Sequence, residues 1–132
     1  MAIDSLQHLT DPDRCRTLVL KIGSALLVDA DGNPRAEWLD ALVREIAGLR
    51  ERGQNVIVVS SGAIALGAAR LELPKGGRAS LADAQAAASV GQIALAGLWS
   101  GLLEQHGISA AQMLVTLDDL EERKRYLNAS RR

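Results

Sequence analysis

Short apolar runs alternate with longer amphipathic stretches along this chain. Thr17–Ile22 and Asn55–Ser60 are rich in β-branched residues and leucine, and each is directly followed by small, turn-forming residues. Runs of this length and continuity are typical of strands buried on both faces. Residues 110–116 are a third short run of mainly apolar residues. The pattern therefore predicts three buried strands, with turns at Gly23-Ser24 and Ser61-Gly62.

Between these runs, apolar residues recur every three or four positions, which is typical of amphipathic helices. Residues 35–52 show this spacing, and Gly53 is well placed to end the helix that it predicts. The segment 80–106 predicts a long helix in which Gly91 is a weak point. Two shorter helices are predicted over residues 63–71 and 117–125.

The order strand, helix, strand, helix, strand, helix predicts an α/β fold, in which helices cover both faces of a mainly parallel sheet. The expected architecture is therefore a three-layer α/β/α sandwich. Residues 1–15 contain no apolar run, so we expect a flexible lead-in before a domain over residues 16–132 and no signal peptide. We also expect no stretch long and apolar enough to span a membrane.

Composition narrows the function classes. The chain has 132 residues, of which 15 are basic and 16 acidic. The resulting charge of −1 argues against a general nucleic-acid binder. Cys15 is the one cysteine, so an intrachain disulfide is excluded and a reducing cytoplasm is the natural compartment. No Cys/His cluster supports a metal site, and neither a P-loop nor a dinucleotide-binding fingerprint is present.

The first candidate site follows the first predicted strand. In an open parallel sheet, ligands bind where strands end and helices begin. Lys21 stands at the end of this strand, followed by Gly23 and Ser24. A buried lysine is costly unless its ammonium reaches water or a partner, and an ammonium beside a glycine and a hydroxyl suits phosphate oxygens. The alternative is an edge lysine beside an ordinary turn.

The second candidate site follows the second predicted strand. Ser60 and Ser61 precede Gly62, which permits a tight turn, and Ala63 begins the next helix. The free backbone N–H groups at a helix start favour a carboxylate or a phosphate. The alternative is a serine that simply caps the helix. Since the two strands are expected to be neighbours, the two loops support each other as parts of one site.

At these loops the sequence resembles the amino acid kinase family. The resemblance runs from about Arg16 to the last residue. The segments that carry it are VLKIGSAL (19–26), VIVVSSGAIALG (56–67), AASVGQ (87–92), QMLVT (112–116) and RYLNA (125–129). Other branches of the family typically have Lys-x-Gly-Gly where this chain has Gly23-Ser24. The resemblance is therefore to the branch that phosphorylates glutamate.

The resemblance implies a role for each matching residue. Lys21 would contact the phosphates of ATP and neutralise charge in the transition state, and Gly23 and Ser24 would line the same phosphate path. Magnesium usually assists such transfers, but no residue here is assigned to a metal. Glutamate would be held near its reacting carboxylate by Ser61, Gly62 and Ala63.

The resemblance also implies a context for the activity. The product would be L-glutamyl 5-phosphate, made in the cytoplasm as the first step of proline biosynthesis, with proline as a feedback inhibitor. The apolar surface of the long helix leads us to expect a homo-oligomer. The substrate loop and nucleotide-binding half of the family do not occur within residues 1–132, so we expect an incomplete domain that is inactive alone. Two alternatives stay open: a family member acting on carbamate, aspartate or a nucleotide, and a non-catalytic regulatory module.

Overall fold

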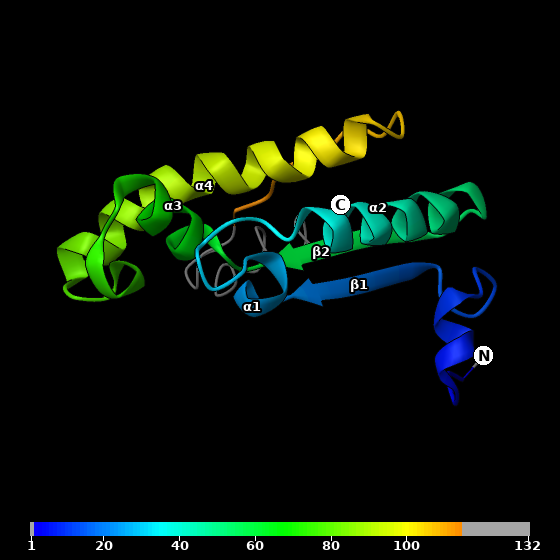
Figure 1. The fold of residues 1–132 in the computed structure, drawn as a ribbon. Helices are drawn as coiled ribbons and strands as arrows, with labels where there is room; N and C mark the ends of the chain where they lie inside the picture. Colours follow the sequence, from blue (N-terminus) through cyan, green and yellow to red (C-terminus); the bar gives the residue numbers. More distant parts are fainter. Residues whose placement is uncertain (1, 115–132) are drawn as a thin grey trace.

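The computed structural model describes residues 2–114, and the predicted helix over residues 117–125 lies outside that range. Two strands and three longer helices form the body of the fold (Figure 1). The strands are β1 (Thr17–Ile22) and β2 (Asn55–Ser60), and the helices are α2 (Ala36–Glu51), α3 (Ala63–Leu71) and α4 (Leu81–Glu104). Shorter helical turns are η1 (Leu6–Thr10), α1 (Ser24–Leu27) and η2 (Pro74–Gly77). The first two predicted strands are confirmed, and so are the predicted helices over residues 35–52, 63–71 and 80–106.

The sheet is parallel, as predicted. β1 pairs with β2 in a register that places Thr17 opposite Asn55 and Ile22 opposite Ser60. Side chains of the inner face join a core with α2 and α4, which contains Ile22, Leu27, Val28, Leu39, Val43, Leu66, Leu95 and Trp99. The α/β class is thus confirmed, and the described residues supply a sheet and one helical layer.

The outer face of the sheet is open, which contradicts the prediction of strands buried on both faces. The exposed fractions of Val19, Ile57 and Val59 are 57%, 44% and 49%. A sequence run can show that a strand is apolar on both faces, but the burial of each face depends on which layers are present. Within residues 2–114, α2 and α4 pack on one face of the sheet (Figure 1).

The third predicted strand is not formed in its described part. Residues 110–114 have no regular secondary structure, and residues 115 and 116 lie outside the described range. Met113 and Leu114 are exposed. A strand is stabilised by pairing with a neighbouring strand. Residues 110–114 pair with no described strand, so they do not take up a strand conformation.

Helices α3 and α4 pack with their backbones in close contact. A Cβ atom added at Gly67 would overlap the carbonyl oxygen of Ala87, and one added at Gly91 would overlap that of Ala63. Helix α4 is continuous through Gly91, so this glycine is not a break in the helix but the point at which α3 can approach it. This contact fixes the amino end of α3 against α4.

Helix α4 is 24 residues long and, by length and composition, apolar enough to cross a membrane. This finding contradicts the expectation that no stretch would meet that criterion. One such helix is weak evidence for a span, because core helices pass the same test. In this structure Leu95 and Trp99 of α4 belong to the core with residues of β1 and α2, and 22% of its apolar window is buried.

The segment before β1 is attached to the domain through Gln54. This side chain is 2% exposed, and its amide nitrogen donates to the carbonyl oxygens of Leu9 and Cys15, the latter at 2.9 Å. Leu9 lies in η1, so a buried side chain next to β2 holds two points of the segment. The flexibility of residues 1–15 and the domain boundary stay predictions.

Candidate functional site

The parallel register brings the two predicted loops to the same edge of the sheet. Lys21 lies opposite Val59, and Ile22 lies opposite Ser60. One residue further on, the N–H of Ser61 donates to the carbonyl oxygen of Ile22 at 2.9 Å. The chain therefore leaves both strands side by side, and the expectation that these loops are neighbours is confirmed.

Lys21 lies on the open face of the sheet. Its neighbours on that face include Val19 and Val59, both exposed. Within residues 2–114 its ammonium makes no ion pair. The desolvation cost expected for a lysine in a buried strand is absent here, since the ammonium reaches water directly. A cation on an apolar surface at a strand end is available to an anionic ligand.

The predicted turn at Gly23-Ser24 is the start of a short helix instead. Gly23 is the N-cap of α1, and its carbonyl oxygen accepts hydrogen bonds from the N–H groups of Leu26 and Leu27 at 3.1 and 3.2 Å. This cap could not be read from the residue types, because glycine caps through its backbone alone. Ser24 is exposed in the first turn of α1, so its hydroxyl is accessible at the strand end.

The second loop has a backbone conformation that only glycine adopts readily. Gly62 has φ +116° and ψ 0°, and it is the N-cap of α3 without any side-chain capping bond. The alternative of a serine that caps this helix is therefore wrong. Ser61 is exposed, and the Oγ of Ser60 donates to the carbonyl oxygen of Ser61 at 3.0 Å. The Ser61 hydroxyl and the amino end of α3 thus remain available to a ligand.

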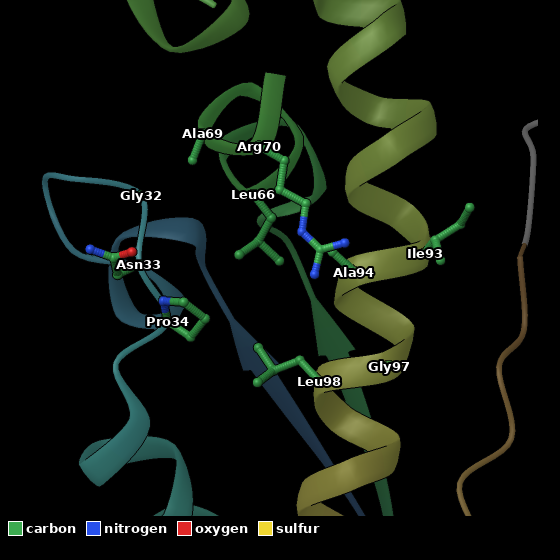
Figure 2. A pocket seen from close by; sticks show the side chains of 10 residues that line it. All are labelled: Gly32, Asn33, Pro34, Leu66, Ala69, Arg70, Ile93, Ala94, Gly97 and Leu98. Carbon is green, nitrogen blue, oxygen red and sulfur yellow. The ribbon is translucent and has the colours of Figure 1, made fainter. Parts of the chain in front are cut away.

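A separate hollow lies away from the strand ends, beside the loop after α1. Its volume is about 540 Å³, and it is an open hollow lined by residues of that loop, α3 and α4 (Figure 2). Apolar side chains of Pro34, Leu66 and Leu98 form much of its wall, and Arg70 is its charged residue. None of the residues predicted from the sequence to bind ATP or glutamate lines this hollow.

Metal ligands are not gathered in the described part of the chain. Among residues 2–114, no group of three or more His, Cys, Asp and Glu side chains is placed to hold a metal ion. The strand ends carry a lysine, serines and glycines instead. The described residues can therefore supply positive charge and hydrogen-bond donors, but not a carboxylate cage.

Sequence comparison defines the class of protein. The profile described as the amino acid kinase family matches residues 16–132. The match includes both strand-end loops, and the chain belongs to this family.

Its relatives indicate the branch. The chain is 68% identical to the glutamate 5-kinase of Novosphingobium aromaticivorans over 130 residues, which is 98% of this chain and 34% of that relative. It is 60% identical to the glutamate 5-kinase of Zymomonas mobilis over 119 residues, covering 90% of this chain and 30% of the relative. For the glutamate 5-kinase of Sphingopyxis alaskensis the identity is 61% over 122 residues, with coverages of 92% and 33%. The chain thus spans about a third of the length of the curated relatives it matches.

Proposed function

We propose that this chain is the amino-terminal part of an ATP-dependent kinase that phosphorylates the side-chain carboxylate of L-glutamate. The product is L-glutamyl 5-phosphate, and the reaction is the first step of proline biosynthesis. The observation that carries the proposal is the 68% identity, over 98% of this chain, to a relative named glutamate 5-kinase. The adjacent ends of β1 and β2 support it, because a phosphoryl donor and its acceptor must be held side by side.

In the proposed reaction, a carboxylate oxygen of glutamate attacks the γ-phosphorus of ATP. The new bond joins that oxygen to phosphorus, the bond to the β,γ-bridging oxygen breaks, and ADP leaves. The protein has little covalent chemistry to perform, so alignment and charge stabilisation supply the catalysis. Lys21 is the catalytic residue in this scheme: its ammonium neutralises charge on the transferring phosphoryl group. Gly23 and Ser24 line the phosphate path beside it.

Glutamate is held by the second loop in this proposal. The hydroxyl of Ser61 and the backbone N–H groups at Gly62 and Ala63 are hydrogen-bond donors at the positive end of α3. Such donors favour a carboxylate. The contact between Ala63 and Gly91 of α4 holds this end of α3 in place, which supports a rigid acceptor site.

Magnesium is the metal that this reaction class normally uses to neutralise phosphate charge. The described residues offer no carboxylate cluster for it, so they do not by themselves fit a magnesium site. In our proposal, the contribution of residues 2–114 to charge neutralisation is the Lys21 ammonium. The metal would be bound by ATP itself and by residues outside the described range.

The remaining parts of the proposal concern context. We place the enzyme in the cytoplasm, which agrees with the lone Cys15, and we expect inhibition by proline and assembly into a homo-oligomer. A flexible lead-in over residues 1–15 agrees with a family match that begins at residue 16. Residues 1–132 alone should be inactive, because their described part is a two-stranded sheet with an open outer face.

The test is a substrate assay on the full-length protein. ADP release is measured with ATP and magnesium, with and without L-glutamate, and hydroxylamine is added to trap the acyl phosphate as γ-glutamyl hydroxamate. We expect ADP release that depends on glutamate and an equal amount of hydroxamate. Aspartate, carbamate and a nucleoside monophosphate serve as alternative acceptors. Turnover with one of these and not with glutamate would assign the chain to another branch, and no turnover with any acceptor would favour a regulatory module.

A further inference from the structure

Residues 24–34, which we call the α1 segment, make contact with both loops of the site. The segment begins directly after Gly23, and it contains α1 and the loop that leads towards α2. Leu27, the last residue of α1, is fully buried. It belongs to the core cluster together with Ile22 at the end of β1 and Leu66 of α3. Leu27, which follows the proposed phosphate-binding loop, is thus buried beside α3, which follows the proposed glutamate-binding loop.

The contact between Leu27 and Gly62 is direct. A Cβ atom added at Gly62 would overlap Cδ2 of Leu27, and it would lie 3.5 Å from its Cγ and 3.6 Å from its Cβ. The leucine side chain therefore occupies the space that any side chain at position 62 would need. It lies against the backbone that joins Ser61 to Ala63.

Hydrogen bonds fix Leu27 within the α1 segment. Its N–H donates to the carbonyl oxygen of Gly23 at 3.2 Å, and its own carbonyl oxygen accepts from the N–H of Arg35 at 2.9 Å. The Nε of Arg35 also donates to the carbonyl oxygen of Ala25 at 3.0 Å. Backbone hydrogen bonds therefore tie Leu27 to Gly23 on one side and to Arg35 on the other.

The loop of the α1 segment makes a second contact with α3. Asp29 orders this loop, since its Oδ1 accepts hydrogen bonds from the N–H groups of Asp31 and Asn33 at 2.9 and 3.0 Å. A Cβ atom added at Gly32 would lie 2.6 Å from the Cβ of Ala69. Figure 2 shows this loop beside the part of α3 that carries Ala69. The segment thus touches α3 at its amino end and again about two turns later.

We propose that Leu27 is a positioning residue. It would set the spacing between the phosphate loop (residues 21–24) and the glutamate loop (residues 61–63). Its N–H is bonded to Gly23 and its side chain lies against Gly62, so its volume affects how these two residues are placed beyond the hydrogen bond that joins Ser61 to Ile22. This inference rests on the proposed function, because the spacing matters only if donor and acceptor are bound at these loops. A misplacement of about 1 Å can reduce the rate of such a reaction roughly a hundredfold.

The test compares two buried leucines in the full-length enzyme. Leu27→Ala removes the contact with Gly62. Leu49→Ala makes the same chemical change near the far end of α2, at a residue that is 6% exposed and outside the cluster that contains Leu27. The folded fraction is measured by circular dichroism, and kcat and both KM values are expressed per folded molecule. Leu27→Met serves as the conservative variant that restores most of the volume.

We expect Leu27→Ala to lower kcat by about tenfold to a hundredfold. Leu49→Ala should lower the unfolding temperature but leave kcat within about twofold, since it leaves both loops untouched. Leu27→Met should recover most of the lost kcat, because its volume is similar.

Equal kcat values per folded molecule in Leu27→Ala and Leu49→Ala, with an active wild type, would overturn the positioning role and leave the proposed function intact. A wild type without glutamate-dependent turnover would overturn both. If Leu27→Ala does not fold, the same comparison between Leu27→Val and Leu49→Val decides, with a lower kcat expected only for Leu27→Val.

Discussion

Replacing Gly91 by alanine tests whether α3 and α4 must touch through their backbones. At this position an added Cβ atom would overlap the carbonyl oxygen of Ala63, and the N of Gly67 would lie only 2.8 Å away. Both obstacles are backbone atoms, which cannot rotate aside as a side chain can. The two helices must therefore separate at the point where α3 begins.

The expected magnitude is the balance of two opposing terms. Overpacking of a tight contact costs about 1 to 3 kcal/mol, and the upper end applies here because backbone atoms must move. An alanine in a helix is about 1 kcal/mol more favourable than a glycine. Gly91→Ala should therefore lower the free energy of unfolding by about 2 kcal/mol.

Gly97 is the matched control in the same helix. A Cβ atom added there would meet no atom of residues 2–114 within 4 Å, so only the helix-propensity term applies. Gly97→Ala should raise the free energy of unfolding by about 0.5 to 1 kcal/mol. The same substitution thus has opposite signs at two positions of α4.

Urea unfolding of the full-length protein, followed by circular dichroism, measures both changes as shifts of the transition midpoint. Because Gly91 contacts Ala63 at the proposed glutamate site, Gly91→Ala should also raise the KM for glutamate. Two midpoints that shift in the same direction by similar amounts would refute the backbone contact between α3 and α4.

Two further predictions concern single side chains. Lys21→Ala should lower kcat by at least about a hundredfold, comparable to the loss of one preorganised charge donor. Lys21→Arg should not fully restore kcat, since a forked guanidinium does not reproduce a compact ammonium. Near-normal turnover in a folded Lys21→Ala variant would contradict the catalytic role of Lys21. Gln54→Ala should leave the carbonyl oxygens of Leu9 and Cys15 without their donor and lower the free energy of unfolding by about 1 to 3 kcal/mol. Limited proteolysis of the segment before β1 should therefore become faster. An unchanged cleavage rate would contradict the attachment of this segment through Gln54.

The local elements could be predicted well from the sequence. The limits of β1 and β2 follow from continuous apolar runs, and those of α2 follow from an apolar face that repeats every three or four residues. The start of α4 has a local cause of the same kind, since the Oγ of Ser80 accepts from the N–H of Asp83 at 3.0 Å. Such signals lie within a few residues of the structure that they determine.

Several of the failures concern contacts between distant parts of the chain. The open outer face of the sheet and the unpaired residues 110–114 depend on which other strands and layers are present, and no local pattern records that. Gly91 was interpreted as a weak point because a sequence does not show that another backbone lies against it. Leu27 attracted no attention for the same reason: its contact with Gly62 joins residues 35 positions apart.

The candidate site was predictable to the extent that it lies at strand ends. The register of β1 and β2 brings the two loops together as expected, because consecutive parallel strands place their carboxyl ends at one edge. The residue types at that edge, a lysine with glycines and serines, indicate anionic ligands by themselves. The contacts through which α1 and α4 hold the loops in position could be found only in three dimensions.

The central claim is that one loop binds ATP phosphates and the other binds glutamate. Comparing Ser24→Ala with Ser61→Ala in the full-length enzyme tests it most directly, because both serines are exposed and each change removes a single hydroxyl. The measurement is the KM for ATP and for glutamate in each variant. The account predicts that Ser61→Ala raises mainly the KM for glutamate and Ser24→Ala mainly that for ATP. Equal effects on both substrates in both variants, or the reverse assignment, would contradict it.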